Sequence, residues 1–263
     1  VGTGLALVVG SPLTAALSEL WGWRLAVAAI TAAALTVLIA ARFALPVMAL
    51  PAGDTGAWRV RHTRNRRLVT MSLLTLVGVT GHFISYTFIV VIIRDIVGVG
   101  GPNLAWLLAA YGVAGLVAMG LLARPGDRHP KAAVVGCMAG LSGVFAVLAA
   151  LGFGGRNTVA TLLIGIIAVV IWGATATAVP PMLQSAAMRH CPQDPDGASG
   201  LYVTAFQVGI MAGSLLGGLL FEHGGEPVML SASALLIAGA LACVLVSRDL
   251  FAAAPADIPT SEK

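Results

Sequence analysis

His82 is the ionisable residue that lies deepest in a long apolar stretch of this sequence, and polar residues accompany it at helical spacing. Thr75, Ser85 and Tyr86 lie seven, three and four positions from it, so a helix places all four residues on one face. A polar face in apolar surroundings is costly and turns towards neighbouring helices or a water-filled cavity. We therefore expect His82, Ser85 and Tyr86 to line a path for a solute or a proton. The alternative is a packing histidine that is hydrogen-bonded to a neighbour.

Two further apolar stretches carry side chains that could contact a solute. Thr204 and Gln207 lie nearly opposite a stripe of small residues, because two residues advance a helix by about 200°. Trp172 and Thr175 share one face of the other stretch. We expect these four residues to line a cavity. Alternatively, the hydroxyls bond carbonyls of their own helix and the aromatic ring packs in a core.

The chemistry of most enzymes and metal sites has no counterpart here. All 11 acidic residues lie in loops, tails or the ends of apolar stretches. The three cysteines, Cys137, Cys191 and Cys243, are far apart and have no histidine at ligand spacing. The phosphate-binding, zinc-protease, nucleophile-elbow and dinucleotide motifs do not occur. We therefore expect no catalytic residues, no metal and no cofactor.

The composition indicates what surrounds these residues. Of the 263 residues, 58% are hydrophobic and only 10% are charged, whereas a soluble domain has roughly 25% charged residues. The mean hydropathy is +0.95. This excludes a soluble enzyme, a nucleic-acid-binding protein and a disordered chain. The net charge of +4 therefore does not indicate nucleic acid as a partner, and the expected partner is a lipid bilayer.

The apolar stretches predict an all-α, polytopic bundle of transmembrane helices. A bilayer core of about 30 Å requires about 20 helical residues, and eight segments are long enough. They are Val1–Leu20, Leu25–Leu45, Leu68–Ile93, Leu104–Ala123, Ala132–Phe153, Thr158–Pro180, Gly200–Phe221 and Pro227–Ser247.

The basic residues predict how the eight spans are oriented. If successive spans alternate in direction, one side of the membrane holds twelve of the 15 basic residues. These are Arg42, Arg59, Arg61, Arg64, Arg66, Arg67, Arg124, Arg128, Lys131, Arg189, Arg248 and Lys263. The other side holds Arg24, Arg94 and Arg156. The positive-inside rule places the richer side, with the C-terminus, in the cytoplasm.

A repeat relates the two ends of the chain. At an offset of 203 residues, GSPLTAALSELWGW from Gly10 aligns with GSLLGGLLFEHGGE from Gly213. Stripes of small residues share this register and would let neighbouring backbones approach; they include Gly10, Gly209, Gly213 and Gly217. Such patterns are common in membrane helices, but a shared register favours a parallel repeat of two similar six-helix halves. On that interpretation, the counterparts of spans three to six precede Val1, and the chain is the last two thirds of a longer transporter.

The residues resemble the C-terminal portion of a major facilitator superfamily transporter of the arabinose-efflux or drug-efflux type. GLALVVGSPLTAALSELWGWR resembles the fifth of that family's twelve helices, and Gly10 and Pro12 match its antiporter motif, although Thr14 replaces a glycine. HFISYTFIVVIIRDIVGV resembles the seventh helix. The resemblance implies a partial major-facilitator fold. It divides the chain into two helices of an N-terminal bundle (1–45), a cytoplasmic linker (46–67), a six-helix bundle (68–247) and a cytoplasmic tail (248–263).

The loop GLLARPGDRHPKAA resembles the second copy of the family's charged cytoplasmic loop. Asp127, Arg128 and Lys131 match its charged positions, whereas Ala123 and Pro130 replace its glycines. The resemblance implies that these three residues latch helix ends during alternating access. The alternative is a charged turn that only follows the positive-inside rule.

The resemblance implies a secondary transporter in the bacterial plasma membrane, monomeric at full length, that exports a small sugar-like or drug-like solute. Protons are a possible coupling ion, and no membrane-centred carboxylate occurs in this chain to carry them. The alternative is a non-transporting membrane remnant, or a helical module that assembles with another chain.

Overall fold

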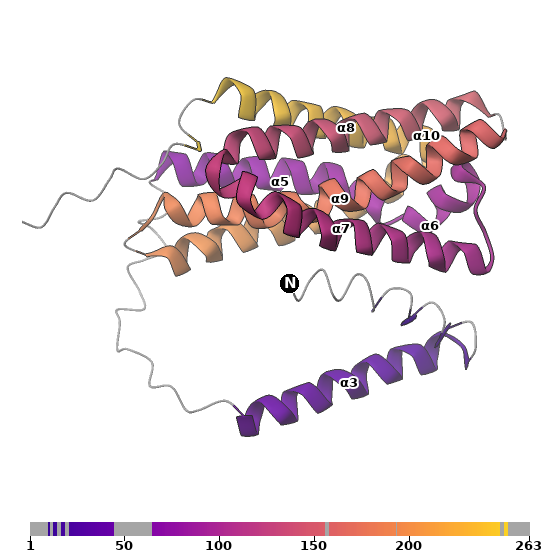
Figure 1. Cartoon of the computed structure of the whole chain (residues 1–263), viewed down its shortest axis with the longest axis horizontal. Helices are drawn as coiled ribbons and strands as arrows, with labels where there is room; N and C mark the ends of the chain where they lie inside the picture. The colour runs from indigo at the N-terminus through magenta and orange to yellow at the C-terminus, as the bar shows by residue number, and fades with distance from the viewer. Residues whose placement is uncertain are drawn as a thin grey trace, which may run out of the picture.

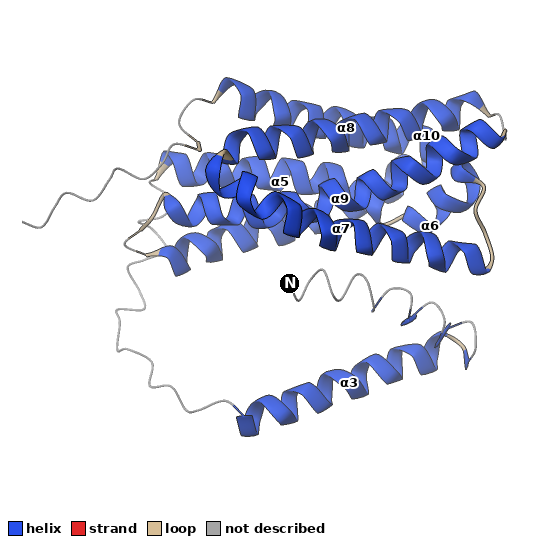
Figure 2. Cartoon of the chain, viewed as in Figure 1, coloured by secondary structure: helices blue, strands red, loops and turns tan. Residues whose placement is uncertain are grey.

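The computed structural model describes residues 10, 13–14, 17–18, 21–44, 65–155, 158–192, 194–247 and 250–251. Within these ranges the regular structure is helical, as Figure 2 shows, and six helices are long and apolar enough to cross a membrane. The all-α membrane fold is thereby confirmed for the described residues. Most of the predicted span Val1–Leu20, Pro12 and the linker up to residue 64 lie outside them.

The helices follow one another along the chain with short connections (Figure 1). They are α3 (Trp23–Ala44), α5 (Arg66–Tyr86), α6 (Ile89–Ile92), the π-helix η2 (Ile93–Val97), α7 (Pro102–Arg128), α8 (Pro130–Gly154), α9 (Val159–Arg189) and α10 (Pro195–Val246). Helix α3 lies apart from the others in Figure 1, and Ala26 is its one buried residue. The remaining helices form a bundle.

The predicted span Leu68–Ile93 is not one continuous helix. Helix α5 ends at Tyr86, and Thr87 and Phe88 form a turn before α6 and η2. The Thr87 hydroxyl donates to the Phe83 carbonyl oxygen at 2.9 Å, and the Phe88 N–H donates to the Ser85 carbonyl oxygen at 3.0 Å. Hydrogen bonds from a threonine hydroxyl to a preceding carbonyl often bend a helix. The sequence prediction missed this break because no proline or glycine lies between His82 and Ile93.

Helix α9 does not end at Pro180, as the sequence predicted, but continues to Arg189. Pro180 and Pro181 have no N–H group, so the carbonyl oxygens of Ala176 and Thr177 lack their usual partner four residues on. Membrane helices tolerate such gaps when neighbouring groups or water satisfy the freed oxygens. The double proline therefore interrupts the hydrogen bonding of α9 without ending the helix.

Two predicted spans are joined in α10. The 52-residue element contains Gly225 at φ 68° and ψ −171°, followed closely by Pro227. This left-handed backbone favours glycine, which has no Cβ. Gly213 in the first half faces Thr80 of α5, and Ile237 in the second half faces the adjacent Gly81. The chain therefore reverses direction at Gly225, and both halves of α10 pack beside α5.

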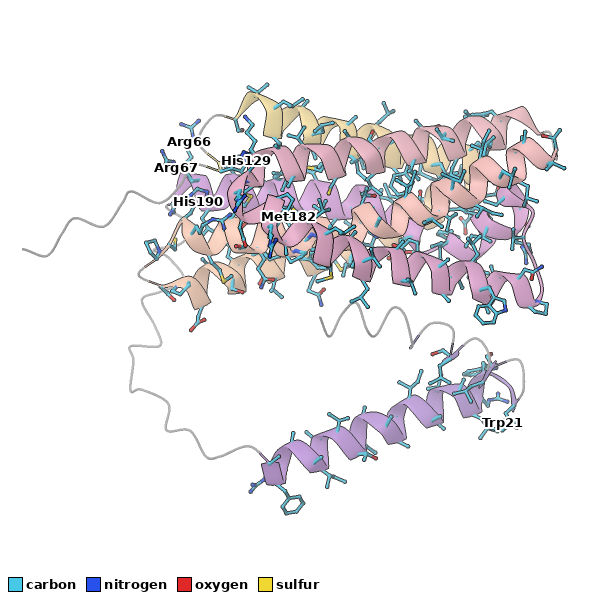
Figure 3. The ribbon with its side chains drawn as sticks, in the orientation of Figure 1. Trp21, Arg66, Arg67, His129, Met182 and His190 are labelled. Atoms are coloured by element: carbon cyan, nitrogen blue, oxygen red, sulfur yellow. The ribbon has the colours of Figure 1, made fainter. Side chains whose placement is uncertain are left out.

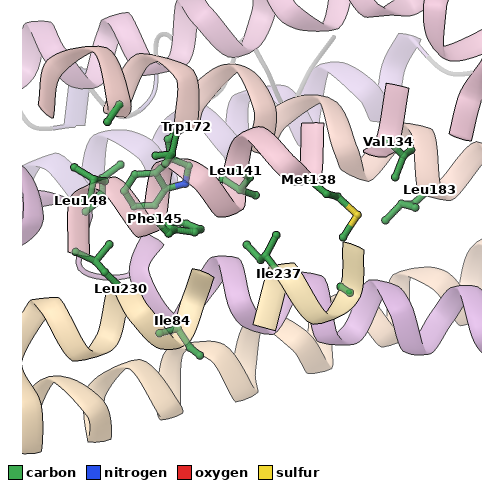
Figure 4. Packing of buried hydrophobic residues seen from close by; sticks show 14 of the residues in the cluster. Ile84, Val134, Met138, Leu141, Phe145, Leu148, Trp172, Leu183, Leu230 and Ile237 are labelled. Atoms are coloured by element: carbon green, nitrogen blue, oxygen red, sulfur yellow. The ribbon is translucent and has the colours of Figure 1, made fainter. Parts of the chain in front are cut away.

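Large buried side chains from all of the bundle helices form one core. Trp172 and Phe145 are its largest fully buried members, and Figure 4 shows them packed with Leu148, Leu230 and Ile84. The outside of the bundle is also apolar: for example, Leu121, Leu215 and Leu235 are 71%, 65% and 73% exposed. An apolar exterior of this extent suits contact with lipid chains.

Arg66, Arg67, His129 and His190 lie at one end of the bundle (Figure 3). Hydrogen bonds from side chains to the backbone hold this end together. Asn65 Nδ2 donates to the His190 carbonyl oxygen at 3.1 Å, which joins the start of α5 to the end of α9. His190 Nε2 is 2.9 Å from the Leu250 carbonyl oxygen. These bonds fix the relative positions of the start of α5, the end of α9 and the segment after α10.

Candidate functional site

A cavity of about 500 Å³ lies inside the bundle, between α5, α7, α8, α9 and both halves of α10. Drug-sized ligands occupy pockets of about 300–1,000 Å³ that are mostly apolar with a few polar groups. This cavity fits that description, since its wall is built chiefly from aromatic and aliphatic side chains.

Helix α5 contributes His82, Phe83 and Tyr86 to the wall. The His82 and Tyr86 rings are stacked, with centroids 5.1 Å apart and planes 27° apart. Phe83 meets the His82 ring edge to face at 5.1 Å. These are the geometries that aromatic quadrupoles favour. The spacing of one helical turn between His82 and Tyr86 produces this stack directly.

Trp172 of α9 lies behind His82. Its indole Nε1–H donates to His82 Nδ1 at 3.2 Å, and its side chain is fully buried. Phe145 of α8 packs against the indole at 4.8 Å, and Tyr111 of α7 packs against it at 5.9 Å, both nearly perpendicular. The cavity wall is therefore backed by an aromatic cluster that joins four helices.

Close contact between α7 and α9 positions Trp172. A Cβ atom on Gly173 would lie far inside the van der Waals radius of the Tyr111 carbonyl, so only glycine allows the two backbones to approach. The contact brings Tyr111 to the edge of the cavity beside Trp172.

Polar groups on the wall are few and neutral. The Tyr86 and Tyr111 hydroxyls make no hydrogen bond to another described residue, and both side chains line the cavity. The Tyr202 hydroxyl donates to the Pro180 carbonyl oxygen at 2.8 Å. Ala176 and Thr177, whose carbonyl oxygens lack a proline N–H partner, also lie on the wall.

No Asp, Glu, Lys or Arg is among the residues that line this cavity in the described part of the chain. The described residues also contain no group of three or more side chains that could hold a metal ion. The cavity is suited to a neutral ligand, because it has no counter-ion for a charged one.

The seven residues singled out for the cavity occupy different positions. His82 and Tyr86 line the wall, and Trp172 supports His82 from behind. Ser85 is buried on another face of α5 and its hydroxyl is 2.7 Å from that of Ser233. Thr175, Thr204 and Gln207 also lie outside the lining.

Thr175 donates to the Ile171 carbonyl oxygen at 2.8 Å, and its methyl group lies beside Gly140 of α8. Thr204 and Gln207 are exposed on α10, and the Thr204 hydroxyl donates to the Gly200 carbonyl oxygen at 2.8 Å. Both threonines thus make the bonds to their own helix that the alternative interpretation expected.

Several wall residues have no counterpart in the sequence prediction. Phe83, Phe206 and Leu141 look like ordinary core residues in sequence, because apolar residues surround them. The sequence does offer an indication for three other wall residues, because each has a polar side chain within a long apolar stretch or, for Gln184, in the continuation of α9 beyond Pro180. These residues are Tyr111, Tyr202 and Gln184. A search restricted to polar stripes misses single polar residues on separate helices.

The small-residue stripe of α10 lies directly against α5. Cβ atoms on Gly209, Gly213 and Gly217 would approach backbone oxygens of Leu76, Thr80 and Ile84 to 3.0 Å or less. By contrast, no described residue lies within 4 Å of a Cβ atom placed on Gly10, and Pro12 is outside the described part of the chain.

The sequence predicted a charged loop between α7 and α8, but a single residue, His129, separates the two helices. Lys131 Nζ donates to the carbonyl oxygens of Ser247 at 2.8 Å and Leu245 at 3.1 Å, at the end of α10. Asp127 lines a smaller cavity of about 200 Å³ between α7 and α9, together with Arg189. Arg128 is the last residue of α7, where a cation favours the helix dipole.

Known proteins resemble the chain along almost its whole length. The family model described as Major Facilitator Superfamily matches residues 1–193 and 71–261. Proteins named chloramphenicol efflux pump from two strains of Mycobacterium tuberculosis, CDC 1551 / Oshkosh and ATCC 25618 / H37Rv, are 64% identical to it over 253 residues. A protein named transcription regulatory protein OpdE, from Pseudomonas aeruginosa PAO1, is 30% identical over 253 residues. These matches cover 94–95% of this chain and 61% of the length of each relative.

Proposed function

The chain belongs to the Major Facilitator Superfamily, and we propose that the protein is an efflux transporter for small, neutral, aromatic solutes such as chloramphenicol. The observation that carries this proposal is the uncharged aromatic cavity inside the bundle. The printed name of the 64% identical relatives supports the choice of solute. Movement of the solute is physical and changes no covalent bond.

The chemistry of chloramphenicol complements the cavity wall. The molecule has a nitrophenyl ring, two hydroxyl groups and an amide, and it carries no charge. Phe83, Tyr86 and Phe206 offer ring faces and edges for the nitrophenyl group. Carbonyl oxygens near Pro180 and Pro181 can accept hydrogen bonds from its hydroxyls, since no proline N–H competes for them.

We infer the membrane setting from the same family and from the charge distribution. We place the protein in the bacterial plasma membrane with the end that carries Arg66, Arg67 and Arg189 in the cytoplasm, because basic residues concentrate on that side. The six-helix bundle over 68–247 would then rock against an N-terminal bundle to which residues 1–45 contribute, and the protein would act as a monomeric antiporter. The linker at 46–67 would join the two bundles, and the tail at 248–263 would lie on the cytoplasmic side. Asp127, Arg128 and Lys131 would latch helix ends at that face.

We infer that a carboxylate that carries protons in coupled transport would lie outside this cavity. The lining residues include no carboxylate, and the apolar stretches of the chain contain none near their centres. We therefore assign the cavity to solute recognition and not to proton transfer. Thr204, Gln207 and Thr175 remain candidates for contact with a solute on its way to the cavity.

Equilibrium binding of radiolabelled chloramphenicol to the purified protein in lipid nanodiscs tests the proposal. Phe206→Ala removes a ring from the wall and should weaken binding about tenfold. Phe221→Ala is the matched control, because Phe221 stacks on Phe88 at 5.0 Å outside the lining. A folded wild-type protein that does not bind chloramphenicol, or equal losses in the two variants, would overturn the proposal.

A further inference from the structure

The hydrogen bond between Trp172 and His82 determines where the imidazole carries its proton. An indole nitrogen can only donate, so His82 Nδ1 must accept the Trp172 N–H at 3.2 Å through its lone pair. A neutral imidazole has one N–H group. That proton therefore resides on Nε2.

The ring cannot easily turn to exchange its two nitrogens. Tyr86 covers one face of the His82 ring, Phe83 meets it edge to face, and Phe145 lies 6.4 Å from it on the α8 side. Trp172 is itself fully buried and packed against Phe145 and Tyr111. A rigid surrounding of this kind keeps one orientation of the imidazole.

The Nε2 edge of the ring is available to a ligand. His82 lines the cavity, and within the described residues its one hydrogen-bond partner is Trp172 at Nδ1. The His82 side chain is only half-buried, and we infer that its Nε2 edge is the part that borders the cavity. The cavity thus presents one fixed N–H donor beside the Tyr86 ring.

No group on the cavity wall would stabilise the positive charge if His82 gained a second proton. The new Nδ1–H would point at the Trp172 N–H, and the existing hydrogen bond would be lost. The other titratable side chains that line the cavity are Tyr86 on α5, Tyr111 on α7 and Tyr202 on α10, whereas α8 and α9 contribute none. No carboxylate lines the cavity to pair with an imidazolium ion.

From this geometry we propose that His82 is a permanently neutral hydrogen-bond donor that recognises an acceptor oxygen on the solute, and that Trp172 is the positioning residue that fixes this role. The acceptor would be a nitro or carbonyl oxygen on an aromatic solute. The inference rests on the proposed function for its ligand. The tautomer itself rests only on the contacts of the two side chains.

Nitrogen-15 NMR of the histidine rings, in the protein embedded in nanodiscs, tests the tautomer without any solute. His82→Gln identifies the His82 signals by their disappearance. We expect a protonated Nε2 and an unprotonated Nδ1 that do not change between about pH 5 and pH 8, the range in which histidine normally titrates. In Trp172→Phe the same ring should titrate or exchange tautomers. A wild-type ring that is protonated at Nδ1, or that titrates in this range, would overturn the proposal.

Binding of chloramphenicol tests the donor role separately. His82→Leu should lose about fivefold to tenfold in affinity, whereas His82→Gln should recover part of it, because its amide supplies an N–H group near the Nε2 position. Both variants must elute as the wild type does in size exclusion. Binding by the wild type with no loss in His82→Leu would refute the inference and leave the proposed function standing. A wild-type protein with the expected tautomer and no binding would refute the proposed function instead.

Discussion

Helix α5 faces two different surroundings, and the contrast separates what holds the bundle together from what contacts a ligand. Towards α10, its backbone touches Gly209, Gly213 and Gly217 so closely that no Cβ atom fits. Towards α9 and α7, it presents the rings of His82 and Tyr86 to a cavity. We call these the glycine seam and the aromatic face.

The glycine seam and the aromatic face differ in which substitutions they can tolerate. In a membrane, helices associate through close packing and a few interhelical hydrogen bonds, because lipid chains are as apolar as the helix surface. The glycine seam supplies the close packing, and a hydrogen bond joins Ser85 of α5 to Ser233 in the second half of α10. The aromatic face has open volume and polar groups without partners. Substitutions in the seam should therefore impair folding, and substitutions on the aromatic face should impair binding.

The largest effect is expected from a side chain added to the seam. Gly217→Val would collide with the Ile84 carbonyl, and we expect a loss of about 1–3 kcal/mol or more in the free energy of unfolding. Gly218→Val is the matched control, since nothing lies within 4 Å of its Cβ position. Unfolding in mixed detergent micelles, followed by tryptophan fluorescence, measures both. Equal stability of the two variants would show that the seam is not tightly packed.

Removal of a ring from the aromatic face should affect affinity more than stability. Tyr86→Ala deletes the stack on His82, and we expect chloramphenicol to bind about tenfold more weakly, which corresponds to about 1.4 kcal/mol. Tyr86→Phe keeps the ring and should keep most of the affinity. Titration calorimetry on the two variants makes the comparison. The interpretation fails if the phenylalanine variant binds as weakly as the alanine variant.

The serine pair should contribute a smaller amount to stability alone. A double-mutant cycle with Ser85→Ala and Ser233→Ala should give a coupling of about 0.6 kcal/mol, as is typical of hydrogen bonds between membrane helices. Chloramphenicol affinity should not change, because neither serine lines the cavity. A loss of affinity in Ser85→Ala would instead place this residue in the binding path.

A residue on neither face should give a similarly small effect, and one that depends on salt. Lys131→Met removes the donor to the last carbonyls of α10, and we expect a loss of about 0.3–1 kcal/mol that shrinks as salt is added. The same unfolding assay, at low and high salt, measures it. A large, salt-independent loss would mean that Lys131 acts through more than the helix end.

The sequence predicted the helical membrane fold and the three-to-four-residue spacing of His82 and Tyr86, because both follow from local patterns. It could not predict the partner of His82. Trp172 lies 90 positions further along the chain, and only the close contact of α7 and α9 at Gly173 brings it into place. The broken helix after Tyr86 was also hidden, since Thr87 and Phe88 are compatible with a continuous apolar helix.

The polar residues that were singled out illustrate a second limit. Ser85, Thr175 and Thr204 have the right chemistry to contact a solute, yet each donates to or pairs with a neighbouring group outside the lining. Spacing along one helix indicates which residues share a face. It does not indicate which neighbour that face meets, and Phe83 and Phe206 reach the cavity without any polar signal.

Photoaffinity labelling tests most directly whether the cavity is where solute binds. A diazirine derivative of chloramphenicol, activated in nanodiscs and mapped by mass spectrometry, should label peptides that contain His82–Tyr86 and Val203–Phe206. An excess of unmodified chloramphenicol should abolish that labelling. Labelling confined to lipid-facing residues such as Leu215 and Leu235, or labelling that excess chloramphenicol does not displace, would contradict the account.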